Sequence, residues 1–114
     1  MPPSVVVVIR EDPLKSHRAV EALRIALGLS TGENPLSVIL LGQAPLMISE
    51  EPEDIVDGEI MEKYLPSFKY LKIPFLVPVG TRARFNLDPE FDVKELSEEA
   101  IRLVISGSSR ILVF

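Results

Sequence analysis

The chain has 114 residues, enough to enclose one hydrophobic core but not two, so a single domain over residues 1–114 is expected. Hydrophobic residues make up 46% of it, which excludes a disordered protein and predicts self-association that covers part of the apolar surface. The sequence contains no cysteine and one histidine. Disulfides, thiolate or histidine-cluster metal sites and a thiol nucleophile are therefore excluded, and we expect no metal and no cofactor.

The net charge of −5 originates in one acidic segment, residues 50–62. This segment holds seven of the 17 acidic residues and no basic one, and the other acidic residues are outnumbered by the 12 basic residues. Its spacing differs from that of a calcium-binding loop, so a solvated surface is expected. The charge balance argues against nucleic acid as a partner. No apolar run is long enough to cross a membrane, and residues 1–4 do not resemble a signal peptide, so we expect a cytoplasmic protein.

The first forty residues predict a strand, a helix and a second strand. Residues 5–9 are five β-branched residues without alternation, which is typical of a strand buried on both faces. Ser16 is placed to cap a helix that ends near Ser30, where Gly32 is expected to adopt a left-handed conformation. Residues 36–41 form a second buried-type strand. Such a βαβ unit requires the two strands to be parallel.

The middle of the chain predicts a second unit of the same kind. Residues 43–49 are too apolar for a linker and predict a short helical turn packed on the sheet or on a neighbouring subunit. Apolar residues at helical spacing predict a helix over 57–71, kinked or broken at Pro66. Residues 73–79 then predict a third strand, which its two prolines keep short.

The last third predicts a loop, a helix and a final strand. Residues 80–85 are expected to form a loop and residues 86–91 a turn. Asp92 with Glu95 resembles a capping box that would start the last helix, which Gly107 would end before a strand over 110–114. The fold class predicted is therefore doubly wound α/β, with a mainly parallel sheet of four to five strands and helices on both faces.

In such sheets ligands bind at the carboxyl ends of the strands, which singles out residues 10–17, 42–46 and 79–85. We predict a ligand pocket there, with a histidine at a helix N-terminus and arginines that pair with oxyanions. Its candidate residues are Arg10, Ser16, His17, Gln43, Thr81 and Arg82. The alternatives are that Ser16 only caps, that His17 lies on the surface, and that the arginines, with Arg84, pair with the acidic segment of this or a neighbouring subunit. Neither a P-loop nor a G-x-G-x-x-G fingerprint is present.

In the order and spacing of its elements the sequence resembles the DsrE/DsrF family of small sulfur-relay proteins, particularly its YchN-type members. The similar segments are the first helix with its Leu-Arg-x-Ala pattern, the second strand and following turn, the proline-marked start of the third strand, and the C-terminal strand (residues 16–27, 40–44, 70–74 and 106–114). The resemblance implies a doubly wound α/β fold that assembles into trimers or hexamers.

The resemblance also implies a function, but this sequence departs from the family pattern at the position on which that function depends. In active members of that family a cysteine after the third strand carries persulfide sulfur; here Pro78 or Thr81 stands at that position. We therefore expect a non-catalytic homo-oligomer, an accessory subunit that supports a cysteine-bearing sulfur carrier. The alternative is a small-anion or nucleotide-binding protein whose pocket lies at the carboxyl ends of strands 1 and 3. An enzyme that uses His17 as acid or base with Arg82 ranks last, because no second titratable group is evident beside His17.

Overall fold

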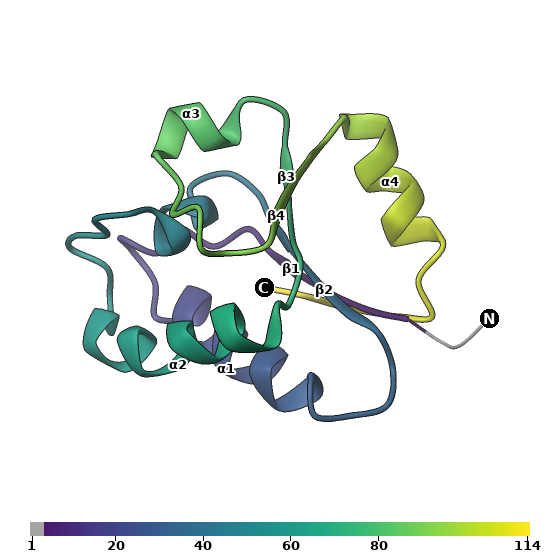
Figure 1. The fold of residues 1–114 in the computed structure, drawn as a ribbon, viewed down its shortest axis with the longest axis horizontal. Coiled ribbons are helices and arrows are strands. Elements are labelled where there is room, and N and C mark those ends of the chain that lie inside the picture. Colours follow the sequence, from purple (N-terminus) through teal and green to yellow (C-terminus); the bar gives the residue numbers. More distant parts are fainter. Residues whose placement is uncertain (1–3) are drawn as a thin grey trace.

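A five-stranded, all-parallel sheet organises the chain in the computed structural model, which describes residues 4–114 (Figure 1). The strand order is β4-β3-β2-β1-β5. The strands are β1 (Val5–Ile9), β2 (Leu36–Leu40), β3 (Phe75–Pro78), β4 (Val93–Leu96) and β5 (Arg110–Val113). The predicted α/β class and the parallel sheet are confirmed. The expectation about a signal peptide concerns residues 1–4, of which residues 1–3 lie outside the described part.

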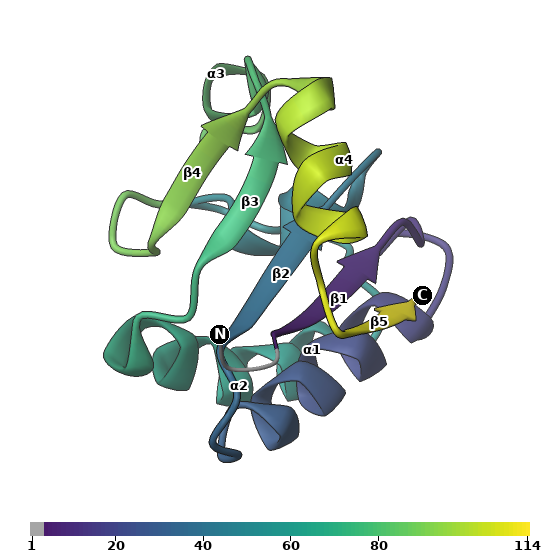
Figure 2. The ribbon, with the colours of Figure 1, turned by 90° about the vertical axis from the view of Figure 1, so that its right-hand side faces the viewer.

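Helices cover both faces of the sheet, as predicted. On one face lie α1 (Arg18–Leu29) and α2 (Gly58–Leu71), and on the other lies α4 (Glu98–Ser106) (Figure 2). The chain steps in one direction from β1 to β4 and then returns to place β5 beside β1. Because crossovers are right-handed, a reversal of direction moves the connecting helix to the opposite face. Two short helices, η1 (Ala44–Ile48) and α3 (Thr81–Phe85), follow the carboxyl ends of β2 and β3.

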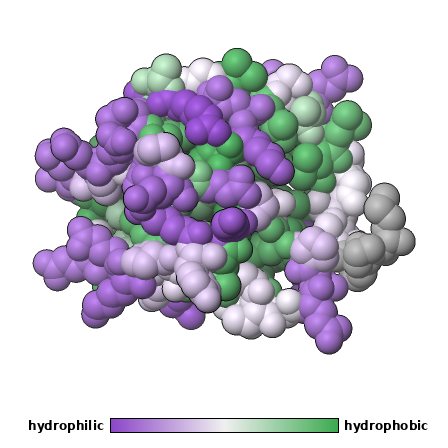
Figure 3. Space-filling model, viewed as in Figure 1, coloured by the Kyte–Doolittle hydropathy of each residue, from purple (hydrophilic) through white to green (hydrophobic). Residues whose placement is uncertain are grey.

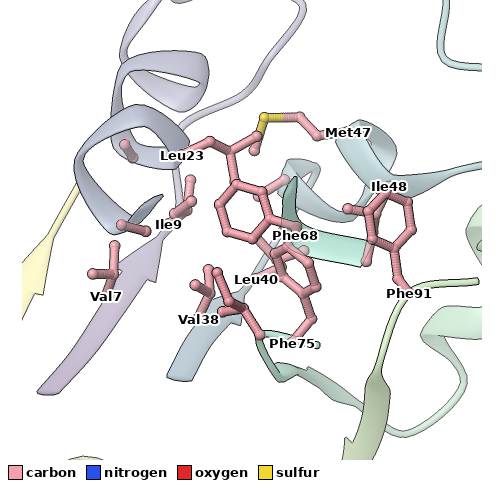
Figure 4. Packing of buried hydrophobic residues seen from close by; sticks show 14 of the residues in the cluster. Val7, Ile9, Leu23, Val38, Leu40, Met47, Ile48, Phe68, Phe75 and Phe91 are labelled. Carbon is pink, nitrogen blue, oxygen red and sulfur yellow. The ribbon is translucent and has the colours of Figure 1, made fainter. Parts of the chain in front are cut away.

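The core is unequal on the two faces of the sheet. Between the sheet and the α1 and α2 helices, Phe68 packs on Phe75 with ring centroids 5.3 Å apart, and Phe91 meets Phe75 edge-on at 5.7 Å (Figure 4). The α4 face has a smaller cluster of five buried residues, Val6, Val8, Ile39, Leu76 and Ile101. The helix α4 therefore covers less of the sheet than the helix pair on the other face.

The largest correction to the sequence prediction concerns residues 92–97. Val93–Leu96 is a strand parallel to β3, and the helix that Asp92 was expected to start begins only at Glu98. Residues 80–85, expected to be a loop, contain the short helix α3. The reason for the first error is that Ser97 is the true N-cap: its hydroxyl accepts the Ala100 N–H at 3.1 Å. Pairing with β3 outweighs the weak capping-box pattern at Asp92.

Two local predictions also need correction. α1 ends at Leu29 with Ser30 as its C-cap, as predicted, but Gly32 does not adopt the expected left-handed conformation. His17 directly precedes α1 and makes no side-chain capping hydrogen bond, whereas the Ser16 hydroxyl caps the helix by accepting the Arg18 N–H, as predicted. α2 runs through Pro66 as one helix, so the predicted break is wrong, and the Pro66 side chain is exposed. A proline on the solvent side leaves the unpaired carbonyl one turn earlier accessible to water, so the helix can continue. The helical turn expected over 43–49 is confirmed by η1.

Polar and apolar side chains are unevenly distributed over the surface. Polar residues dominate the part of the surface over the acidic segment and α2, and apolar residues gather around α4 (Figure 3). Within residues 4–114, no helix has the length and apolar character needed to span a membrane.

Candidate functional site

A pocket of about 310 Å³ lies at the carboxyl ends of β2 and β3, which we call the β2–β3 pocket. The strands, the turn before η1 and the short helix α3 supply its walls. The lining residues are Leu40, Gly42, Pro45, Pro78, Val79, Gly80, Thr81, Arg84 and Phe85. Two of the three loops that the sequence singled out, residues 42–46 and 79–85, therefore meet in one pocket.

Two glycines with left-handed backbone conformations shape this pocket. Gly42 has a φ of +61° directly after β2, and Gly80 has a φ of +92° directly before α3. Residues with a side chain rarely adopt these angles, so glycine allows the chain to turn sharply at each strand end. No described atom lies within 4 Å of the position that a Cβ of Gly80 would take, so backbone conformation rather than crowding favours glycine there.

The chemistry of the pocket is limited to one hydroxyl and one guanidinium group. Thr81 is buried, and its hydroxyl donates a hydrogen bond to the Pro78 carbonyl oxygen at 2.6 Å. Arg84 is exposed, its Cζ lies 4.8 Å from the centre of the Phe85 ring, and it forms no ion pair within residues 4–114. Of the described residues, none with a carboxylate or an imidazole lines the pocket. The Thr81 hydroxyl is thus donated to the backbone, and no carboxylate or imidazole among the described lining residues stands ready to accept its proton.

Arg82, one of the predicted pocket residues, is turned toward β4. Its backbone N–H donates to Glu95 Oε2 at 3.1 Å, and its guanidinium Nη2 donates to the Val93 carbonyl oxygen. It is not among the residues that line the β2–β3 pocket. In the structure Arg82 links α3 to the edge strand.

Arg10 lies at a different pocket from Thr81. It lines a hollow of about 330 Å³ at the carboxyl ends of β1 and β5, together with Glu11, Asp12, Val113 and Phe114. From the sequence we expected a pocket at the carboxyl ends of strands 1 and 3, but β2 lies between these two strands in the sheet. Thr81 and Arg10 are therefore not brought together in one pocket.

The remaining candidates also line neither pocket. The Ser16 hydroxyl accepts the Arg18 N–H at 3.1 Å, and the exposed His17 makes no capping hydrogen bond with its side chain. Gln43 is half-buried at the N-cap of η1, next to Gly42. The structure thus gathers only Thr81 of the six candidates into the β2–β3 pocket, and any ligand-binding role of the others stays a prediction. Pro45 and Phe85 were missed as individual residues, although the strand-end rule marked their loops.

The acidic segment forms a third hollow, of about 520 Å³, at the start of α2. Asp54 and Asp57 have left-handed φ angles of 59° and 61° there. Among residues 4–114, no group of three or more histidine, cysteine or acidic side chains is arranged to hold a metal ion. The ion pairs within the described chain do not join Arg10, Arg82 or Arg84 to this segment.

Comparison with known proteins gives a likeness in structure alone. No family model matches the sequence, and no curated protein matches it. The structure is similar to the crystal structure of the ychN protein from E. coli, with a TM-score of 0.75 and 16% sequence identity over 98% of this chain and 99% of that one. Identity at this level shows the fold and nothing further. The chain thus has the YchN-type, DsrE-like α/β fold.

Proposed function

We propose that this chain is a non-catalytic, homo-oligomeric protein that supports sulfur transfer by a cysteine-bearing partner in the cytoplasm. The chemistry of the β2–β3 pocket carries the proposal. Persulfide transfer needs a thiolate that can accept and release a sulfur atom. The pocket offers instead Pro78 and the Thr81 hydroxyl, which is already donated to the Pro78 carbonyl oxygen. The thiol must therefore come from another protein.

Exposed apolar side chains support the homo-oligomer. Val79 at the end of β3 is 72% exposed, and Leu103 on α4 is 65% exposed. Within the described chain, α4 is the only helix on its face of the sheet, and the apolar cluster beneath it is small. Large exposed apolar residues on a thinly covered face are typical of a surface that contacts another subunit.

Native mass spectrometry of the protein isolated from its own cells tests both parts of this proposal. The expected result is an assembly of several copies with a cysteine-bearing subunit attached. Leu103→Glu is expected to lower the number of copies, because it places a charge in an apolar contact. Tyr70→Glu is the matched control, since Tyr70 is exposed at the end of α2, on the other face. A monomer without a partner would contradict the proposal.

The effect on sulfur transfer is measured separately. The co-isolated partner is loaded with persulfide, and its transfer of sulfur to a thiol acceptor is followed with and without this chain. We expect the rate to change when the chain is present, and the chain itself to acquire no persulfide. An unchanged transfer rate would contradict the proposed role in sulfur transfer but not the proposed assembly.

A second candidate function, small-anion or nucleotide binding, is favoured by Arg84. Its guanidinium group borders the β2–β3 pocket and has no ion-pair partner within the described residues. Such a group pairs with carboxylate or phosphate oxygens. Titration calorimetry with inorganic phosphate and with a nucleoside monophosphate tests this, with Arg84→Gln as the variant and Arg102→Gln on α4 as the control. Equal heats from the two variants would rule this function out.

A further inference from the structure

The strand β5 has an edge that pairs with no other described strand. It lies at the end of the sheet, beside β1 (Figure 2). The N–H of Arg110 donates to the Ser4 carbonyl oxygen at 3.1 Å, and the N–H of Phe114 donates to that of Val8 at 2.8 Å. Alternate residues of a strand direct their N–H and C=O to opposite sides. Ile111 and Val113 therefore direct these groups away from β1, toward the outer edge of the sheet.

The same two residues carry exposed apolar side chains. Ile111 is 41% exposed and Val113 is 55% exposed. In the parallel register they stand beside Val6 and Val8, which are buried in the cluster under α4. Ile111 and Val113 thus continue an apolar row of the sheet past the region that α4 covers. The edge has neither a lysine nor a proline, the residues that commonly prevent edge-to-edge pairing.

The two ends of β5 carry opposite charges. Arg110 is exposed at the start of the strand and forms no ion pair within residues 4–114. At the other end, Glu11 and Asp12 share a hollow with Val113 and Phe114, and the Glu11 N–H donates to the Phe114 carbonyl oxygen at 3.3 Å. A strand with a cation at one end and anions at the other is complementary to itself in the antiparallel direction. The charges thus indicate a second copy of this chain as the occupant of the edge.

We propose that β5 pairs antiparallel with β5 of a second copy about a two-fold axis at Leu112, which extends the sheet across the two subunits. The proposal rests on the homo-oligomer proposed above and specifies one of its interfaces. Ile111 then lies opposite Val113 of the partner subunit, and each such pair exchanges two backbone hydrogen bonds. Their side chains lie on the same face and pack against each other.

The charges fit this register as well. Arg110 lies opposite Phe114 of the partner subunit, where Glu11 and Asp12 of the partner subunit adjoin it. Because the interface is two-fold, each charged contact occurs twice. A two-fold contact also pairs the subunits, so the assembly contains an even number of copies, such as two, four or six, and is not a trimer.

The substitution Ile111→Pro tests the backbone pairing. Proline removes the N–H that faces the partner but none of those that bond to β1, so the fold is expected to be preserved. We expect the measured assembly mass to fall to half, with the dissociation constant of the two-fold contact raised roughly tenfold to a hundredfold. Ile111→Thr keeps the N–H and is the matched control, with a smaller effect expected. Circular dichroism reports whether each variant is folded.

Charge reversal tests the interface without altering the backbone. Arg110→Glu and Glu11→Arg are each expected to weaken the assembly, and the double variant is expected to restore it, because the two charges then meet again with their signs exchanged. The Glu11 side chain faces Arg18 of its own chain at 3.6 Å, an exposed pair whose loss has little effect on folding.

The outcomes separate the two proposals. A wild-type trimer, or an oligomer whose mass none of these variants changes, would overturn the β5 pairing and leave the homo-oligomer standing. A monomeric wild-type protein would overturn both. Additive weakening in the double variant, with no restoration, would also overturn the pairing of Arg110 with Glu11 across the axis.

Discussion

Lys69 Nζ lies 2.9 Å from Asp88 Oδ2, an ion pair that fastens helix α2 to the turn between α3 and β4. Both side chains are partly buried, Glu90 Oε2 lies 3.2 Å from the same ammonium group, and the ammonium also stands 4.9 Å above the Phe91 ring. Asp88 in turn donates its backbone N–H to the Ile48 carbonyl oxygen at 2.9 Å. This group of contacts joins α2, η1 and the turn after α3. Helix α3 forms part of the wall of the β2–β3 pocket.

Lys69→Met is therefore expected to lower the free energy of unfolding by about 1 kcal/mol, since it removes a partly buried ion pair and a cation–π contact while keeping an apolar chain of similar length. Lys63→Met, at an exposed position of the same helix with no ion pair within residues 4–114, is the control. Urea unfolding measures both. Equal midpoints for the two variants would show that the Lys69 contacts do not stabilise the fold.

Stability should fall in acid because of Asp88. The N–H of Glu90, which donates to Asp88 Oδ1 at 2.9 Å, and the nearby Lys69 together hold the pKa of this carboxyl below its ordinary value. A carboxyl whose folded pKa is lower than its unfolded one stabilises the fold above the unfolded pKa, and this stabilisation is lost as the pH falls through the folded pKa. Between about pH 5 and about pH 2, Asp88→Asn should show a flatter decline of unfolding free energy than the wild type.

At alkaline pH the contribution of Lys69 to stability changes in the opposite direction, because it is lost as the pH rises. The pKa of Lys69 is raised, chiefly by its hydrogen bond to Asp88, so its stabilising effect is complete below the unfolded pKa and disappears as the pH rises through the folded one. Lys69→Met should lack this alkaline decline. Parallel alkaline profiles of variant and wild type would contradict the assignment.

Thr81→Val should destabilise the protein by about 1 kcal/mol, because it leaves the Pro78 carbonyl oxygen without its buried hydrogen-bond donor. Thr31→Val is a close control: its hydroxyl donates to the Gly28 carbonyl oxygen at a similar distance, 2.7 Å, but at an exposed site where water can replace it. Thermal unfolding compares the two variants. A Thr31 variant at least as unstable as the Thr81 variant would contradict the importance of burial.

Ser97→Ala should cost about 1 kcal/mol, since Ser97 caps α4 by accepting the Ala100 N–H. In the last turn of the same helix, Ser106→Ala removes only a long hydrogen bond of 3.2 Å to the Leu103 carbonyl oxygen, and it should change stability little. Unfolding of both variants in urea tests the observed start of α4. A neutral Ser97→Ala variant would show that this capping hydrogen bond does not stabilise α4.

The sequence by itself determined the βαβ core of this protein. Uninterrupted β-branched runs such as residues 5–9 are stable only as strands covered on both faces, and the helical spacing of Leu23 and Ala26 provides that cover, so β1, α1 and β2 follow from local pattern. The absence of cysteine likewise excludes a persulfide-carrying site on this chain, whatever its fold.

Only the tertiary structure decided which strands are neighbours. Residues Val93–Leu96 have a mixed apolar and polar pattern that does not by itself predict a strand. They form one because they pair with the free edge of β3. The order β4-β3-β2-β1-β5 separates Arg10 from Thr81, and Arg82 bonds to β4. The residues that the sequence assigned to one pocket therefore lie in different places. Strand order and side-chain direction arise from contacts between residues far apart in the chain, and local periodicity carries no information about them.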